Sequence, residues 1–170
     1  MELTKIDRSC FERAVLLALE AEKTENLPVG AIIALGGKMI AEGKNASWQP
    51  ELRLHKHAEI EALRDIPKDL IEKAREMTLY TTLEPCLMCF GAIMLFGIGR
   101  LIFGSADDFG GASVSFGHLP EFFEHQFQNM EWIGPAYTAV CDPLFARLTE
   151  LEQIKYGSEE KCWEQMILNQ

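Results

Sequence analysis

The chain has 170 residues, of which 48% are hydrophobic and 25% are charged, and its formal net charge is -10. This composition is typical of a soluble protein with one globular domain and a substantial core. Residues 101–170 carry eleven acidic and three basic side chains, a net charge of -8, which argues against a large nucleic-acid footprint.

The first residues and the cysteines indicate a reducing compartment. The N-terminus is charged and lacks the apolar core of a signal peptide, and the longest uncharged run, residues 85–99, is too short to span a bilayer. Five cysteines at irregular spacing argue against a disulfide framework, so we expect Cys10, Cys141 and Cys162 to be free thiols. A cytoplasmic location is the resulting prediction.

The N-terminal part of the chain predicts a helix followed by a β-hairpin. An apolar stripe over residues 11–21 predicts an amphipathic helix with Asp7 or Ser9 as its cap. Residues 29–35 and 38–42 predict two strands joined by a tight glycine turn.

The middle of the chain predicts a parallel β-α-β unit. Residues 45–53 read as a polar loop, and a helix is expected to open at His57 and to end before Pro67. Residues 77–82 and 101–104 predict strands on either side of a helix that starts near Pro85. This helix is apolar nearly all round, which predicts burial in the middle of the domain. A ligand site is expected at the carboxyl end of the first of these strands.

The C-terminal third predicts mainly helices. We expect, in order, a loop at 105–117, an amphipathic helix at 119–128, a last strand at 132–141 interrupted at Gly134-Pro135, and a helical segment from about 143 to 170 broken near Gly157. There is no internal repeat or linker, so the prediction is a single α/β domain over residues 1–170, with the segment 143–170 packed on it.

Cys86, Cys89 and His57 form a candidate metal site. Two cysteines three residues apart share one face of a helical turn, so both sulfurs can reach one ion. The positive end of the helix dipole favours the thiolate form that binds metal. With His57 as third ligand, two sulfurs and one nitrogen give the pattern of catalytic zinc, which leaves a fourth position for water. We therefore predict a Zn²⁺ site formed by His57, Cys86 and Cys89.

Glu59 is the candidate proton carrier beside this site. Residues two apart do not share a helix face, so Glu59 is poorly placed to ligate beside His57 but well placed to take a proton from water. His-x-Glu followed by Pro-Cys-x-x-Cys is the signature of zinc nucleobase deaminases. The hypothesis is hydrolytic deamination of an aromatic ring, with release of ammonia.

The sequence resembles the cytidine and deoxycytidylate deaminase superfamily, and within it the branch of bacterial tRNA-specific adenosine deaminases and guanine deaminases. The resemblance covers residues 28–112 and is carried by Pro28-Val29-Gly30-Ala31, Glu42-Gly43-Lys44-Asn45, His57-Ala58-Glu59-Ile60, residues 79–89 and Ile98-Gly99-Arg100. It implies a three-layer α/β/α sandwich with a central mixed five-stranded sheet, and a homodimer. It also implies substrate contacts from Asn45, the backbone N–H of Ala58 and Val29, with Glu84 and Pro85 beside them.

The sequence departs from the tRNA enzymes in regions that bear on the substrate. Residues 53–56 replace their usual Asp-Pro-Thr-Ala, the lysine expected after Asp107 is absent, and the C-terminal segment is acidic rather than basic. The leading hypothesis is therefore a deaminase of a free nucleobase or nucleoside. The alternatives are deamination of the wobble adenosine in tRNA, a catalytically silent zinc-bound subunit, and a thiol redox protein using Cys86 and Cys89. A structural zinc site with His55 as fourth ligand is a further alternative.

Overall fold

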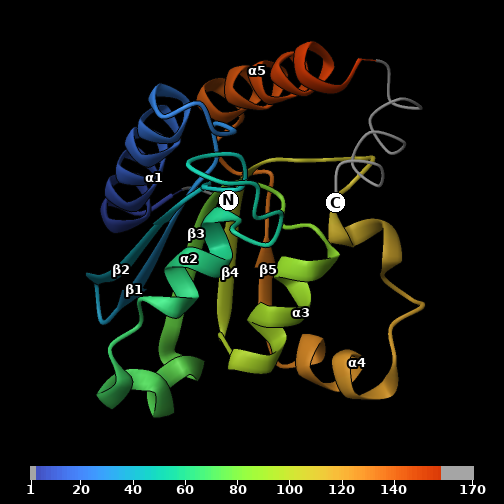
Figure 1. Ribbon diagram of the computed structural model, residues 1–170. Coiled ribbons are helices and arrows are strands. Elements are labelled where there is room, and N and C mark those ends of the chain that lie inside the picture. Colours follow the sequence, from blue (N-terminus) through green and yellow to red (C-terminus); the bar gives the residue numbers. More distant parts are fainter. Residues whose placement is uncertain (1–2, 158–170) are drawn as a thin grey trace.

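A mixed sheet of five strands forms the middle layer of the molecule, as the computed structural model shows for residues 3–157 (Figure 1). The strand order is β2-β1-β3-β4-β5. The first three strands pair in antiparallel fashion, whereas β3, β4 and β5 run parallel. The strands are β1 (Gly30–Leu35), β2 (Lys38–Lys44), β3 (Met77–Leu83), β4 (Arg100–Ser105) and β5 (Glu131–Ile133).

Helices cover both faces of this sheet, which confirms the predicted α/β/α architecture. The α-helices are α1 (Lys5–Lys23), α2 (Ala58–Arg64), α3 (Leu87–Phe96), α4 (Glu121–Gln128) and α5 (Thr138–Tyr156), and two 3-10 helices are η1 (Lys68–Glu76) and η2 (Ala112–Ser115). Alternate strand residues face opposite cores: Ile32 packs with Phe11 of α1, whereas Ile33 packs with Phe90 of α3. The predicted β3-α3-β4 unit is present, with the two strands parallel.

Thr4 caps α1, so the prediction of Asp7 or Ser9 as the cap is wrong. The Thr4 side chain accepts a hydrogen bond from the Asp7 N–H at 3.2 Å, and the Asp7 carboxylate accepts one from the Thr4 N–H at 2.9 Å. This reciprocal pair is a capping box in which Asp7 occupies the third helical position. The same carboxylate is buried and also accepts hydrogen bonds from Tyr80 and Arg100, so it joins α1 to the sheet.

The prediction of a strand over residues 132–141 is wrong beyond Ile133. Strand β5 is three residues long and ends at Gly134-Pro135. Pro135 has no N–H to offer a sheet ladder. The chain nevertheless keeps following β4, because the Ala136 N–H donates to the Phe103 carbonyl at 2.9 Å, before α5 begins at Thr138. The expected C-terminal helix thus starts earlier than predicted and ends at Tyr156, and residues 158–170 lie outside the described part of the chain.

Helix α3 is buried on one side only, which corrects the expectation of burial all round. Phe90, Ile93 and Met94 face the core, but Leu95 is 68% exposed and Leu87 is 55% exposed. The helix carries no charged residue, so its sequence does not indicate which side faces outward.

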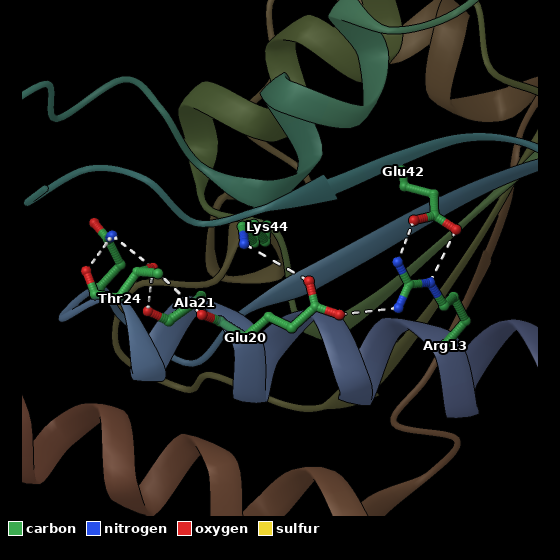
Figure 2. A network of polar contacts seen from close by, with 7 residues as sticks. Arg13, Glu20, Ala21, Thr24, Glu42 and Lys44 are labelled. Carbon is green, nitrogen blue, oxygen red and sulfur yellow. Dashed lines mark hydrogen bonds and ion pairs between the residues drawn. The ribbon is translucent and has the colours of Figure 1, made fainter. Parts of the chain in front are cut away.

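Polar contacts on the surface join α1 to the edge strand β2 (Figure 2). The Arg13 guanidinium binds the Glu42 carboxylate through two nitrogens, at 2.9 and 2.6 Å, and also contacts Glu20 at 3.1 Å. Lys44 extends the network, with its ammonium 3.6 Å from Glu20. The Thr24 hydroxyl donates to the Ala21 carbonyl at the end of α1.

The remaining predictions concern the free cysteines and membrane-spanning helices. Cys10 and Cys141 are buried free thiols, as expected, and Cys162 lies outside the described residues. In the part of the chain that the structure describes, no helix is both long and apolar enough to cross a membrane.

Candidate metal centre and active site

The starts of two helices bring His57, Cys86 and Cys89 together at the carboxyl end of β3. His57 is the cap residue of α2, Cys86 is the cap residue of α3, and Cys89 lies one turn further on. The two sulfurs lie 3.6 and 3.5 Å from Nδ1 of His57, and all three ligand atoms lie within 4.8 Å of one another. Tetrahedral zinc, with bonds of about 2.3 Å to sulfur and about 2.0 Å to nitrogen, requires a sulfur–nitrogen separation of about 3.5 Å. The donor set and its spacing therefore fit zinc.

This group of three is the one potential metal cluster within residues 3–157. His55 is exposed and does not belong to it, so a four-ligand structural site using His55 finds no support. Three protein ligands leave one coordination position for a water or substrate, as catalytic zinc sites do.

Pro85 stands outside the helix that it was expected to begin. Helix α3 starts at Leu87, and Cys86 before it still has an extended backbone. The Glu84 N–H donates to the Ser105 carbonyl at the end of β4, and the Pro85 carbonyl accepts from the Ala112 N–H at the start of η2, so both hold this segment outside the helix. The consequence is that Cys86 precedes the first helical residue and points its sulfur across the helix start toward His57.

Hydrogen bonds within the cluster favour one thiolate even before a metal binds. The Cys89 thiol donates to Cys86 and His57 adds a second hydrogen bond, and together they lower the pKa of Cys86 to about 4 against the opposing effect of burial. The same hydrogen bond to Cys86, together with burial, raises the pKa of Cys89. Burial alone would lower the pKa of His57, but the hydrogen bond to Cys86 and the charge of Glu59 outweigh it and raise that pKa.

Glu59 lies beside the cluster with only 3% of its surface exposed. The Thr81 hydroxyl donates to Oε1 at 2.9 Å, and the Cys89 sulfur lies 3.5 Å from Oε2. Burial raises the pKa of Glu59, and the charge of His57 opposes the rise. A carboxyl with a raised pKa exchanges protons more readily near neutral pH, which suits a proton carrier.

A cavity of about 610 Å³ opens directly onto the metal cluster. His57, Glu59 and Cys86 form one side of it. Among its lining residues, which belong to the described part of the chain, are four carboxylate side chains and no lysine or arginine. These carboxylates are Glu59, Glu84, Asp107 and Glu152. The cavity can therefore hold a small ring but offers no cation to a phosphate.

The residues expected to contact substrate separate into two groups. Val29 and Asn45 line the cavity, and both are buried. Ala58 is buried at the first position of α2, where its N–H has no partner within the helix. Glu84 also lines the cavity, but its carboxylate accepts hydrogen bonds from the N–H groups of Asp107 and Ser113 and so anchors the loop that follows β4.

Helix α5 supplies cavity residues that the sequence reasoning did not name. The cavity is lined by five residues from the middle and the last part of this helix: Phe145, Leu148, Thr149, Glu152 and Gln153. Their spacing of three and four residues marks one helix face, but the sequence did not show what that face would meet.

The family model described as the cytidine and deoxycytidylate deaminase zinc-binding region matches residues 4–105, which include both motifs of the site. The chain belongs to this deaminase family. Together with the metal cluster, membership identifies a zinc-dependent hydrolytic deaminase. The matched region ends with β4, so the helix that closes the cavity lies beyond it.

The deaminase resembles enzymes with different substrates. It is 35% identical to the tRNA-specific adenosine deaminase of Bacillus subtilis over 71% of this chain and 76% of that one. A solved structure from work on A-to-I editing by tRNA:A34 deaminases has 34% identity and a TM-score of 0.60, covering 67% of this chain and 90% of that one. The guanine deaminase of Nitrosomonas europaea shares the fold, with a TM-score of 0.63 at 20% identity over 88% of this chain and 87% of its own.

Proposed function

We propose that the protein deaminates a neutral aminated ring, either a free nucleobase or a nucleoside. The observation that carries this proposal is the cavity at the metal cluster, which α5 walls and which contains four carboxylates but no basic side chain among the described residues. A phosphate group would meet these carboxylates and no basic side chain there, so nucleotides and nucleic acid are disfavoured.

We assign His57, Cys86 and Cys89 as the zinc ligands and Glu59 as the catalytic acid and base. Zinc, when bound, lowers the pKa of a coordinated water towards neutrality and so makes a nucleophile available. Glu59 takes a proton from the attacking water and delivers it to a ring nitrogen, while the water oxygen bonds to the carbon that bears the amine. Glu59 then passes the remaining proton to the amine, the carbon–nitrogen bond breaks, and ammonia leaves as a carbonyl forms.

Deamination of adenosine in tRNA is the second candidate. Sequence similarity favours it, because the chain is 35% identical to the tRNA-specific adenosine deaminase of Bacillus subtilis. The acidic cavity and the acidic C-terminal third oppose it. A tRNA substrate would require a basic surface near the cavity mouth to hold the phosphates.

The test is ammonia release by purified, zinc-loaded protein. Adenine, guanine, cytosine, their nucleosides, their nucleotides and tRNA are offered in parallel, with Glu59→Ala as the blank. We expect turnover of a base or nucleoside, much weaker turnover of the matching nucleotide, and none of tRNA. Turnover of tRNA alone would establish the second candidate instead. Ammonia from none of these substrates would overturn both and favour a catalytically silent subunit.

We also infer that two copies associate through the outer side of α3. Leu87, Met88, Leu95 and Phe96 are exposed there, and the small residues Gly91 and Ala92 lie between them at helical spacing. This helix carries no charged residue, so contact across its outer side brings no like charges of its own together, although the net charge of each chain is -10. Sedimentation equilibrium should give a dimer that Leu95→Lys converts to a monomer. A wild-type monomer at micromolar concentration would contradict the inference.

A further inference from the structure

Helix α5 lies across one end of the sheet (Figure 1), and it lines the same cavity as His57 and Cys86. The side of α5 that lines the cavity changes from apolar to polar along the helix. Phe145 and Leu148 come first and are apolar, and Thr149, Glu152 and Gln153 follow. The polar part of this wall is therefore near the end of α5, where Glu152 carries the only charge that the helix contributes to the cavity.

Glu152 is half-buried, yet its carboxylate has no bonding partner among the described residues. Among the described residues it forms no hydrogen bond and no ion pair, unlike Glu84, whose two oxygens are both taken by backbone N–H groups. Burial raises the pKa of Glu152, the nearby Asp107 carboxylate adds to the rise, and His57 opposes it. Two carboxylates near one another in a cavity are stabilised by a ligand that donates N–H groups to them.

Asn45 presents the opposite chemistry to the same cavity. Its side chain is only 2% exposed, and its Oδ1 accepts hydrogen bonds from the N–H of Ser47 at 3.0 Å and from the Ser47 hydroxyl at 2.8 Å. These two donors fix the orientation of the amide. Nδ2 is left as a donor that no described residue accepts from, on a side chain that lines the cavity. A bound ring can supply the acceptor for this donor.

The end of α5 is held in place on both sides of Glu152. Arg147 forms an ion pair with Glu22 of α1 at 2.7 Å. On the far side, the Lys155 ammonium lies 3.9 Å from the centre of the Trp48 ring, and the Tyr156 ring meets the edge of the same indole at a centroid distance of 5.7 Å. Trp48 belongs to the loop that also carries Asn45, so the acceptor and the donor are fixed relative to each other before substrate arrives.

We propose that Glu152 determines substrate specificity: its carboxylate accepts a hydrogen bond from a ring N–H or amino group of the substrate, while Asn45 donates to a ring acceptor. This inference rests on the proposed function and extends it. The substrate class is a neutral aminated ring that presents, besides the amine to be removed, at least one further N–H toward α5. Guanine carries such an N–H beside its amino group, whereas cytosine and adenine present fewer donors. Anionic rings and nucleotides are rejected by the same charge.

The experiment measures binding apart from turnover. Zinc-loaded Glu59→Ala protein is titrated calorimetrically with guanine, adenine and cytosine, and so are the double variants that add Glu152→Gln or the matched control Glu150→Gln. Glu150 lies on the outer side of the same helix, paired with Arg147, and its replacement makes the same change in charge. Zinc content and melting temperature are compared for all three proteins, and Glu152→Ala serves as a second variant that removes the acceptor altogether.

We expect Glu152→Gln to weaken binding of the base with the extra N–H donors by about ten- to a hundredfold, and Glu150→Gln to leave it unchanged. In turnover assays with Glu59 intact, the preference for the parent base over its analogue methylated at the ring N–H should shrink by the same factor. Unchanged affinity and unchanged preference in both Glu152 variants would overturn this inference alone. Failure of every base to bind, with no turnover of any, would overturn the proposed function as well.

Discussion

The Thr81 hydroxyl donates a hydrogen bond to Oε1 of Glu59 at 2.9 Å, and both residues are buried. This bond connects β3 to α2 directly beside the metal cluster and fixes one oxygen of the carboxylate that carries the proton in our proposal. Thr81→Val keeps the shape of the side chain and removes the donor. We expect kcat to fall by roughly tenfold or more, while KM and zinc content stay close to wild type.

Thr78→Val is the matched control for this prediction. Thr78 lies on the same strand, is partly exposed, and is remote from Glu59. Steady-state kinetics should show no change for Thr78→Val. An unchanged kcat in Thr81→Val would show that the hydrogen bond does not orient Glu59.

Removal of either clustered cysteine should remove the metal. Cys86→Ser or Cys89→Ser replaces a thiolate by a hydroxyl, which is a poor zinc ligand, so we expect the zinc content measured by mass spectrometry to fall from one ion per chain to near zero after dialysis. Cys141→Ser changes a buried thiol away from the cluster and should retain zinc. One bound zinc in the wild type would also exclude a thiol redox role, because metal-bound thiolates are not free to cycle.

Asp7 should stabilise the fold in a pH-dependent way. Burial would raise the pKa of Asp7, but hydrogen bonds from Thr4, Tyr80 and Arg100 outweigh it and lower that pKa below its ordinary value of 3.8. A carboxyl whose pKa is lower in the folded state stabilises that state fully at pH values above the unfolded pKa, and this stabilisation is lost as the pH falls through the folded pKa.

Asp7→Asn should therefore lower the free energy of unfolding by about 3 kcal/mol at pH 7, because it removes a buried, hydrogen-bonded charge. The difference in unfolding free energy between variant and wild type should become smaller as the pH drops below 3.8. Urea unfolding at a series of pH values measures both curves. A gap that stays constant down to pH 3 would contradict the assignment.

Gly43 should be intolerant of any side chain. A Cβ on this β2 residue would lie 2.0 Å from the Ala58 carbonyl oxygen and 2.4 Å from the Ala62 nitrogen, so α2 would have to move away from the sheet. We expect Gly43→Ala to cost about 1–3 kcal/mol of unfolding free energy. It should also weaken zinc binding, since α2 carries His57 at its start. Thermal unfolding and zinc titration measure the two effects, and full zinc affinity in the variant would show that α2 adjusts without moving His57.

Much of the site could be predicted from the spacing of residues close together in the sequence. Cys86 and Cys89 meet because one helical turn brings them together, and Glu59 lies near His57 because only one residue separates them. The parallel β3-α3-β4 unit follows in the same way from the alternation of strand and helix. Predictions failed where two local preferences competed. Thr4 rather than Asp7 caps α1, because the Asp7 carboxylate bonds back to Thr4 and onward to Tyr80 and Arg100.

The residues proposed to bind zinc and to carry the proton could be named from the sequence, because residue types at short spacing define them. The residues of the cavity wall opposite them could not be named, because they come from distant parts of the chain. Glu152 and Asn45 are more than a hundred residues apart in the chain, yet they line one cavity because α5 crosses the end of the sheet and meets the loop after β2. No pattern of hydrophobic residues along the sequence predicts that α5 contacts this loop. It depends on contacts between distant elements, among them the one between Trp48 and Lys155.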